Sequence, residues 1–433
     1  MRGKTKIGWK TASGLVIANM IGTGVFTSLG FQLTELKNTW TIVLLWSLGG
    51  VMALIGAFTY AELGTRFRRS GGDYVFLSEI FHPVLGYLYA WISLVVGFSA
   101  PVAIAAMAMT GYLSPFLSSS RAQWLGIGII VAVSAVHSVS VRQSGRFQNA
   151  ATLLKVAFIA ALIGIGFWMA PEVSPSLNFD MSWKNELLLP GFAVSLIYVS
   201  YAYTGWNAAA YIIEEIDAPR KNLPRALISG TLLVTLLYVL LQVVLLKHAS
   251  LSQLEGRVEI ATIAFSNLFP VNGNAWISFF IALQLIGTIS GYIWVGPRIT
   301  QAMAGEFRLW KPLSKTNASG IPVRALWLNS AISIALALTG SFEQVVLYTG
   351  FVLQLMGTLS VASLLFVKRK EDTFKSPWRP VLQLVFILFS LWVLGYMLYD
   401  RPLESLSGLG VIAVGAAVYL FDRKTSDPEQ DGR

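Results

Sequence analysis

The chain has 433 residues, of which 55% are hydrophobic and only 12% are charged, and its net charge is +10. This composition is typical of a protein with many membrane-spanning segments and argues against a nucleic-acid partner. The absence of cysteine excludes disulfides, thiolate metal sites and a cysteine nucleophile. Because the three histidines lie far apart and no span combines a nucleophile with a base, we expect no metal, no cofactor and no enzymatic activity.

Apolar runs of about 20 residues, long enough to cross about 30 Å of hydrocarbon, recur along the whole chain. They predict spans at residues 12–33, 40–63, 84–113, 123–140, 148–170, 189–213, 224–246, 273–300, 324–340, 343–367, 380–399 and 404–421. No segment between them is long enough for a soluble domain. We therefore expect an all-α membrane protein with about 12 transmembrane helices, forming a single integral membrane domain over residues 1–433.

The basic residues are distributed unevenly between the two sides of these spans. Of the 32 lysines and arginines, 25 fall on the two termini and the loops that share a side with them. Cytoplasmic loops carry such an excess, so we expect both termini in the cytoplasm and a location in the plasma or inner membrane. Glu62, at the cytoplasmic end of the second span, is expected to pair with a nearby base, to help a cytoplasmic gate or to be an ordinary interfacial carboxylate.

The stretch Gly14 to Gly30, within the first span, is interrupted near its middle by Gly22-Thr23-Gly24. Backbone N–H and C=O groups do not remain unpaired in lipid unless they line a cavity or bind a ligand, so the interruption indicates a binding site. The alternative is that the glycines allow a neighbouring helix to pack closely.

Lys155 lies inside the apolar run of the fifth span, where a lysine costs about 2.5–3.5 kcal/mol to insert. One interpretation is a side chain that extends to the cytoplasmic surface near Arg142 and Arg146. The interpretation we favour is an ammonium at a cation position in the core, bonded to carbonyls that the broken first helix exposes.

The sixth span has a second interruption, at Tyr201-Ala202-Tyr203-Thr204-Gly205, after which Trp206-Asn207 begins another helical half. The first and sixth spans are each the first of a block of five spans. Broken helices at matching positions in two halves of a chain point to a transporter site, because their half-helix ends present free N–H and C=O groups at mid-membrane.

Four segments resemble the amino acid–polyamine–organocation superfamily: IGTGVF in the first span, YAELG with SGGDY after the second, YAYTGWNAAAYIIEE in the sixth, and GPRITQAMAGE in the eighth. The sixth-span motif is most similar to the L-type amino acid transporters and their bacterial relatives. The resemblance covers nearly the whole chain. It implies a LeuT-type fold in which residues 12–170 and 189–367 form inverted five-helix repeats, followed by helices 11 and 12 at residues 380–421.

Carried over to this sequence, the resemblance implies a substrate site made by both interruptions. Its residues would be Met20, Ile21, Gly22, Thr23, Gly24, Tyr201, Ala202, Tyr203, Thr204 and Asn207. The N–H groups of Thr23 and Gly24 would hold a substrate carboxylate at the start of a half-helix. The carbonyls assigned to the substrate α-ammonium are those of Met20, Ile21, Tyr201 and Ala202.

Three further residues receive roles from the resemblance. Tyr201 matches an aromatic gate, and Thr204 stands where relatives often have Gly or Ser. Lys155 matches a lysine of proton-coupled members and exchangers, at the position where sodium-coupled relatives bind an ion. The resemblance thus implies transport without sodium, by proton symport or by exchange.

Two functions fit these observations. The first is a secondary active transporter that moves amino acids by alternating access; the second is a receptor subunit of the same fold that binds an amino acid without moving it. No Asp, Glu, Lys or Arg stands near either interruption, so neutral amino acids are the expected substrates. We also expect Gly24→Val to fill the carboxylate site while leaving the protein foldable. Apart from the substrate, the lipid bilayer and candidate protons, the sequence carries no signal of a partner or an oligomeric state.

Overall fold

The computed structural model describes residues 6–114, 116–139, 141–171, 177–266, 268 and 273–422, without the side chains of 141–149, 273 and 274. The basic residues counted at positions 1–5 and 423–433 lie outside the described residues, as do the side chains of Arg142 and Arg146. The described residues are mainly helical, and Ile7 and Ile216 form an isolated parallel β-bridge.

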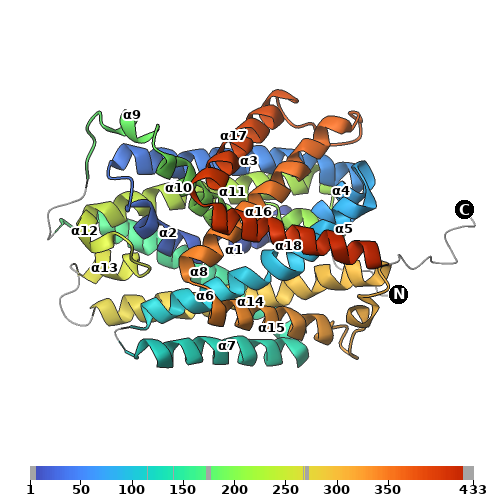
Figure 1. The fold of residues 1–433 in the computed structure, drawn as a ribbon, viewed down its shortest axis with the longest axis horizontal. Helices are drawn as coiled ribbons and strands as arrows, with labels where there is room; N and C mark the ends of the chain where they lie inside the picture. Colours follow the sequence, from blue (N-terminus) through green and yellow to red (C-terminus); the bar gives the residue numbers. More distant parts are fainter. Residues whose placement is uncertain are drawn as a thin grey trace, which may run out of the picture.

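The first part of the chain, up to residue 168, contains α1 (Trp9–Met20), α2 (Gly24–Gln32), α3 (Thr39–Phe67), α4 (Asp73–Ile80), α5 (Pro83–Ile92), the π-helical η1 (Ser93–Gly97), α6 (Ser99–Tyr112), α7 (Ser119–Val139) and α8 (Val141–Trp168). The second part contains α9 (Trp183–Glu186), α10 (Pro190–Tyr203), the 3₁₀ helix η2 (Ala208–Glu215), α11 (Pro219–His248), α12 (Leu251–Leu254), α13 (Ile260–Ser266), α14 (Gly273–Glu306), η3 (Lys311–Ser314), α15 (Val323–Thr339), α16 (Phe342–Ser363), η4 (Leu364–Phe366), α17 (Val381–Asp400) and α18 (Pro402–Phe421). Most of the long helices run side by side along the longest axis of the molecule (Figure 1).

Ten helical segments of the described chain are long and apolar enough to cross a membrane. Two further apolar segments complete the set that the sequence predicts. One is α15, with 17 residues, and the other is α10 followed by η2, which together cover the interrupted sixth span. The prediction of an all-α membrane protein is therefore confirmed, while the inverted relation between the two five-helix blocks stays a prediction.

The two interruptions lie where the sequence places them, and they pack against each other. The first separates α1 from α2 at Ile21-Gly22-Thr23, and the second separates α10 from η2 at residues 204–207. Gly205 has a φ of +103°, and a Cβ there would lie 2.6 Å from the carbonyl carbon of Asn19. Only glycine meets both requirements, because it lacks the Cβ that causes both conflicts.

The half-helix after the first break, α2, is tightly enclosed by its neighbours. Nearly all of its residues are buried. The Tyr112 hydroxyl donates to the Phe26 carbonyl at 2.6 Å, and the Gln242 amide donates to the Val25 carbonyl at 3.2 Å. Gly256 N–H donates to the Gly30 carbonyl at 2.8 Å, so the chain between α12 and α13 covers the far end of α2.

The half-helix before the first break, α1, is held at its free end to the end of η2. Ile7 N–H donates to the Glu215 carbonyl at 2.8 Å, and Asp217 N–H donates to the Ile7 carbonyl at 2.9 Å. These two bonds form the β-bridge and join the outermost turns of α1 and η2.

Glu62 pairs with a base, which is the first of the alternatives that the sequence left open. Its carboxylate, on a side chain only 3% exposed, accepts from the Arg379 guanidinium at 2.7 Å and from Ser376 N–H at 2.8 Å. The segment that leads into α17 is thereby fixed to the end of α3. Breaking such a buried pair typically costs about 3–5 kcal/mol, because one charge is left without its partner.

Several of the basic loops meet at one end of the bundle. Asp372, between η4 and α17, pairs with Arg68 at 2.6 Å and with Arg220 at 3.6 Å. At the same end, the Asp422 carboxylate accepts from Leu309 N–H at 2.9 Å, so α18 ends beside the segment that follows α14. Arg68 and Arg220, both counted on the cytoplasmic side, therefore lie together at this end, and its orientation in a membrane stays a prediction.

The surroundings of Gly24 correct one expectation about a substitution. A Cβ at Gly24 would lie 2.6 Å from the Cα and the Cβ of Ala202, so this glycine allows the two broken helices to touch. A valine there would push them apart, and would not simply fill a carboxylate site in a protein that still folds.

We predict that Gly24→Val lowers the melting temperature of the purified protein strongly, since overpacking of this kind typically costs about 1–3 kcal/mol or more. Thermal unfolding in detergent measures the change. Gly128→Val is the matched control, because a Cβ at Gly128 meets no atom within 4 Å. Equal melting temperatures for the two variants would contradict the close packing of α2 on α10.

Candidate functional site

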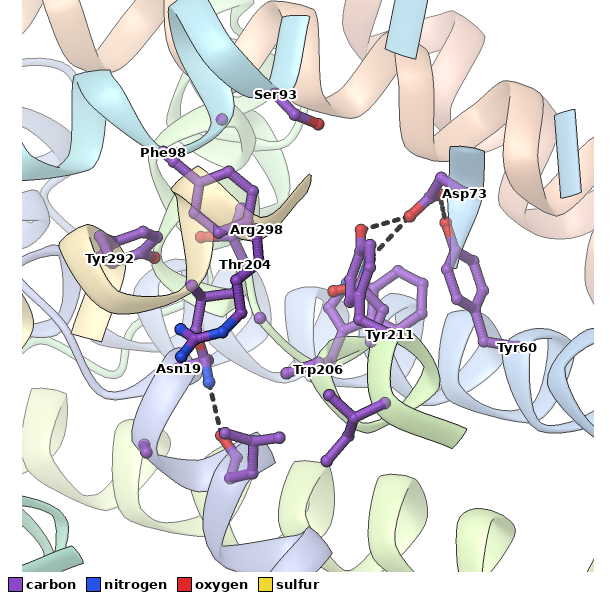
Figure 2. Close-up of a pocket in the computed structure, with 18 of the residues that line it drawn as sticks. Asn19, Tyr60, Asp73, Ser93, Phe98, Thr204, Trp206, Tyr211, Tyr292 and Arg298 are labelled. Atoms are coloured by element: carbon purple, nitrogen blue, oxygen red, sulfur yellow. Dashed lines mark hydrogen bonds between the residues drawn. The ribbon is translucent and has the colours of Figure 1, made fainter. Parts of the chain in front are cut away.

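A cavity of about 610 Å³ lies beside both interruptions. Figure 2 shows Asn19, Thr204, Tyr292 and Arg298 on one side of it and Asp73, Tyr60 and Tyr211 on the other. The cavity extends along α1 and η2 as far as Ile7 and Glu215. It therefore connects the breaks with the end of the bundle at which the described basic loops gather.

Of the predicted substrate-binding residues, Thr204 and Asn207 line this cavity. The others lie away from it in this structure: Met20, Ile21, Gly22, Thr23, Gly24, Tyr201, Ala202 and Tyr203. Most of them are buried between α2, α10 and α11. The structure thus brings all ten residues to the two breaks, but only the second break presents predicted residues to the cavity.

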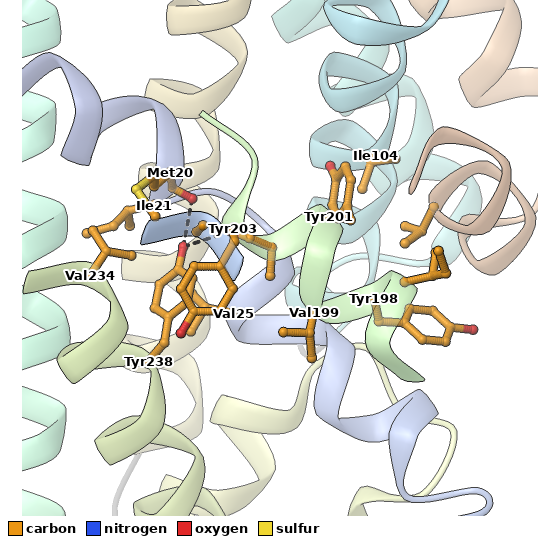
Figure 3. Packing of buried hydrophobic residues seen from close by; sticks show 14 of the residues in the cluster. Met20, Ile21, Val25, Ile104, Tyr198, Val199, Tyr201, Tyr203, Val234 and Tyr238 are labelled. Atoms are coloured by element: carbon orange, nitrogen blue, oxygen red, sulfur yellow. Dashed lines mark hydrogen bonds between the residues drawn. The ribbon is translucent and has the colours of Figure 1, made fainter. Parts of the chain in front are cut away.

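The carbonyls assigned to the substrate α-ammonium already accept hydrogen bonds from the protein. The Tyr238 hydroxyl on α11 lies 2.6 Å from the Met20 carbonyl and 3.2 Å from the Ala202 carbonyl (Figure 3). Thr204 donates to the Tyr201 carbonyl through its N–H at 3.0 Å and its hydroxyl at 2.7 Å. A tyrosine hydroxyl inside an apolar span, such as that of Tyr238, needs a hydrogen-bond partner. The sequence does not reveal which carbonyl that partner is.

Lys155 donates to the Ile21 carbonyl, the remaining one of the four. Its ammonium lies 2.8 Å from the Ile21 carbonyl and 2.8 Å from the Thr288 hydroxyl of α14. The residue is only 2% exposed, so its side chain does not extend to the surface. No carboxylate within the described chain forms a salt bridge with it. The ammonium is thus held by neutral oxygen atoms, as a bound metal cation would be.

Thr23 and Tyr201 meet beside the first break, and neither lines the cavity. The Thr23 hydroxyl and the Tyr201 hydroxyl lie 3.2 Å apart, and both residues are buried. The first N–H groups of α2 have no acceptor within their own helix, and the helix dipole places partial positive charge there. This end of α2 has the chemistry of an anion site.

A hydrogen-bond network around Asp73 was not identified from the sequence, although Asp73 lies in the SGGDY motif. The Asp73 carboxylate accepts from Tyr60, from Tyr211 at 2.5 Å and from the Asn207 amide at 3.4 Å. Burial raises the pKa of this carboxyl, and hydrogen bonds act in the opposite direction. Asn207 and Tyr211 lie more than 100 residues from Asp73 in the chain, so the spacing of the sequence does not show that they are close in space.

Two more charged residues line the cavity, Arg298 on α14 and Glu215 at the end of η2. The Arg298 guanidinium donates to the Trp294 carbonyl and lies 5.1 Å from the centre of the Trp294 ring. Within the described residues, no group of three or more His, Asp or Glu side chains is arranged to hold a metal ion.

The chain is similar to known proteins over nearly its whole length. The family described as "Amino acid permease" matches residues 7–413. "Large neutral amino acids transporter small subunit 2" of Oryctolagus cuniculus is 28% identical over 96% of this chain and 80% of its own length. "b(0,+)-type amino acid transporter 1" of Homo sapiens is 28% identical over 92% and 83%, and "Asc-type amino acid transporter 1" of Mus musculus is 26% identical over 96% and 81%. The chain therefore belongs to the amino acid permease family, within the amino acid–polyamine–organocation superfamily.

Proposed function

We propose that this protein is a secondary active transporter that moves neutral amino acids across the cell membrane by alternating access, without sodium. The observation that carries the proposal is the contact of the Lys155 ammonium with the Ile21 carbonyl, which the first break exposes. A fixed positive charge at this point occupies the space and the oxygen ligands that a sodium ion would need. A mobile sodium ion is then unnecessary to hold the broken helix in place.

The arrangement of open and closed regions supports alternating access. The cavity opens along the inner half-helices α1 and η2, whereas the outer half α2 is covered by Tyr112, Gln242 and the Thr23–Tyr201 contact. With both termini in the cytoplasm, this structure would be the inward-facing state. Tyr201 would act as the gate on the outer side, and a substrate carboxylate would reach the N–H groups of Thr23 and Gly24 when this gate moves.

Neutral substrates follow from the character of the residues at the breaks. Neither break contributes a charged side chain, and the relatives named above include a transporter of large neutral amino acids. The carboxylate of Asp73 already accepts bonds from three side chains. Arg298 and Glu215 carry opposite charges, so together they favour neither a cationic nor an anionic substrate.

Proton symport and exchange are both compatible with a lysine at this position. In symport, the ammonium would release its proton during the cycle; in exchange, the return of a second amino acid would reset the transporter. A receptor that binds without moving its ligand is the remaining alternative. Uptake of labelled amino acid into liposomes that contain the purified protein distinguishes a transporter from a receptor, because only a transporter accumulates label inside.

We predict that uptake is unchanged when choline replaces sodium, because Lys155 stands in the cation position. Lys155→Ala should reduce uptake at least about tenfold, since the Ile21 carbonyl loses a charged donor worth about 1.5–3 kcal/mol. Lys184→Ala, at an exposed lysine, is the control and should transport normally. An absolute requirement for sodium in the wild type would refute the proposal. An imposed pH gradient, compared with internal loading of amino acid, then distinguishes symport from exchange.

We predict that neutral amino acids compete with labelled alanine or leucine, and that arginine, lysine and glutamate do not. Burying an unpaired charged side chain at the breaks would cost several kcal/mol, which excludes such substrates at ordinary concentrations. A panel of twenty unlabelled amino acids in the same liposomes tests this. Strong competition by a charged amino acid alone would show that Arg298, Glu215 or Asp73 recognises the substrate side chain.

A further inference from the structure

Asn207 connects the second break with the network around Asp73. It lines the cavity directly after the interruption of the sixth span. Its side-chain nitrogen lies 3.2 Å from the Tyr211 hydroxyl and 3.4 Å from the Asp73 carboxylate. Asp73 also borders the cavity, but it is only 1% exposed and is bonded to these side chains.

The direction of each hydrogen bond in this network follows from the donors available. With Asp73 ionised, its carboxylate can only accept, so the single hydrogen of the Tyr211 hydroxyl is directed to it at 2.5 Å. The Tyr211 oxygen is then left to accept, and Tyr89 is its second hydroxyl neighbour. Both neighbours of the Asn207 amide on this side are therefore acceptors, which fixes its NH₂ group toward them.

The amide oxygen of Asn207 is consequently the atom left for a ligand. Within the described chain, no donor to this oxygen is present. The backbone carbonyls of Met20, Ile21, Tyr201 and Ala202 already accept from Tyr238, Lys155 and Thr204. An ammonium group that enters the cavity needs acceptors, and the Asn207 oxygen is one that the protein leaves free there.

We propose that Asp73 is a positioning residue for amino-acid recognition: with Tyr211, it holds the Asn207 amide so that its oxygen accepts a hydrogen bond from the substrate α-ammonium. This inference rests on the proposed transport of amino acids and names a determinant of selectivity for the amine. Asp73 does not touch the substrate. Its carboxylate acts by being unable to donate, which leaves the amide of Asn207 with one orientation.

The test compares two ligands that differ only at the α-ammonium group. L-Alanine and L-lactate share carboxylate, chirality and methyl group, but lactate has a hydroxyl in place of the ammonium. Binding of each to the purified protein is measured by the thermal stabilisation it produces over a range of concentrations. The ratio of their affinities is insensitive to a general loss of stability, because both ligands bind the same preparation.

We predict that the wild type prefers alanine and that Asp73→Asn reduces this preference about tenfold. An asparagine at position 73 donates as well as accepts, so the Asn207 amide can turn over and present its NH₂ group to the ammonium. Glu62→Gln is the matched control, since it also changes a buried carboxylate to an amide but lies outside the cavity. It should lower stability and leave the ratio unchanged.

A second variant exchanges the two groups. In Asp73→Asn combined with Asn207→Asp, the new amide donates to the new carboxylate, whose other oxygen faces the ligand, so the preference for alanine should return. If Asp73→Asn does not fold, Tyr211→Phe removes the link between Asp73 and Asn207 and should reduce the ratio likewise. An unchanged ratio in the variant that folds would overturn the role of Asp73. Failure of the wild type to bind any amino acid would instead overturn the proposed function.

Discussion

A peptide group that is released from a helix inside a membrane has to find a partner, and this requirement organises the structure around the two breaks. The carbonyls freed at the first break are met by Tyr238 from α11 and by Lys155 from α8. The carbonyl of Tyr201, at the second break, is met from within the break by Thr204. The first interruption therefore depends on helices that are distant in the sequence, whereas the Tyr201 carbonyl of the second finds its partner locally.

The two halves of the first span differ in how they meet this requirement. The half after the break, α2, is buried, packs on α10 and has two of its carbonyls bonded to Tyr112 of α6 and Gln242 of α11. The half before the break, α1, presents one side to the cavity from Thr11 to Asn19. The junction of the two halves is thus enclosed by protein on the side of α2 and borders the cavity on the side of α1.

Much of this arrangement could be predicted because its signals are local. Glycine within an apolar run marks a break, and a lysine within such a run has to contact oxygen atoms, so the positions of both breaks and the surroundings of Lys155 followed from short stretches of sequence. The partners of Tyr238 and Asp73 could not be predicted, because they depend on which helices become neighbours. Gly24 shows a third case: its presence was noticed, but only the backbone of Ala202 at 2.6 Å explains why no larger residue fits.

The β-bridge between Ile7 and Ile216 has a mechanical meaning. It joins the free end of α1 to the end of η2, while the opposite ends of the same two elements meet at the interruptions, where Gly205 lies against Asn19. These two elements are therefore connected at both ends, by the two hydrogen bonds of the bridge and by the close approach of Gly205 to Asn19. A rotation of α1 alone would have to break one of these connections. The bridge thus favours movement of α1 and η2 as one unit, with the cavity beside them along their length.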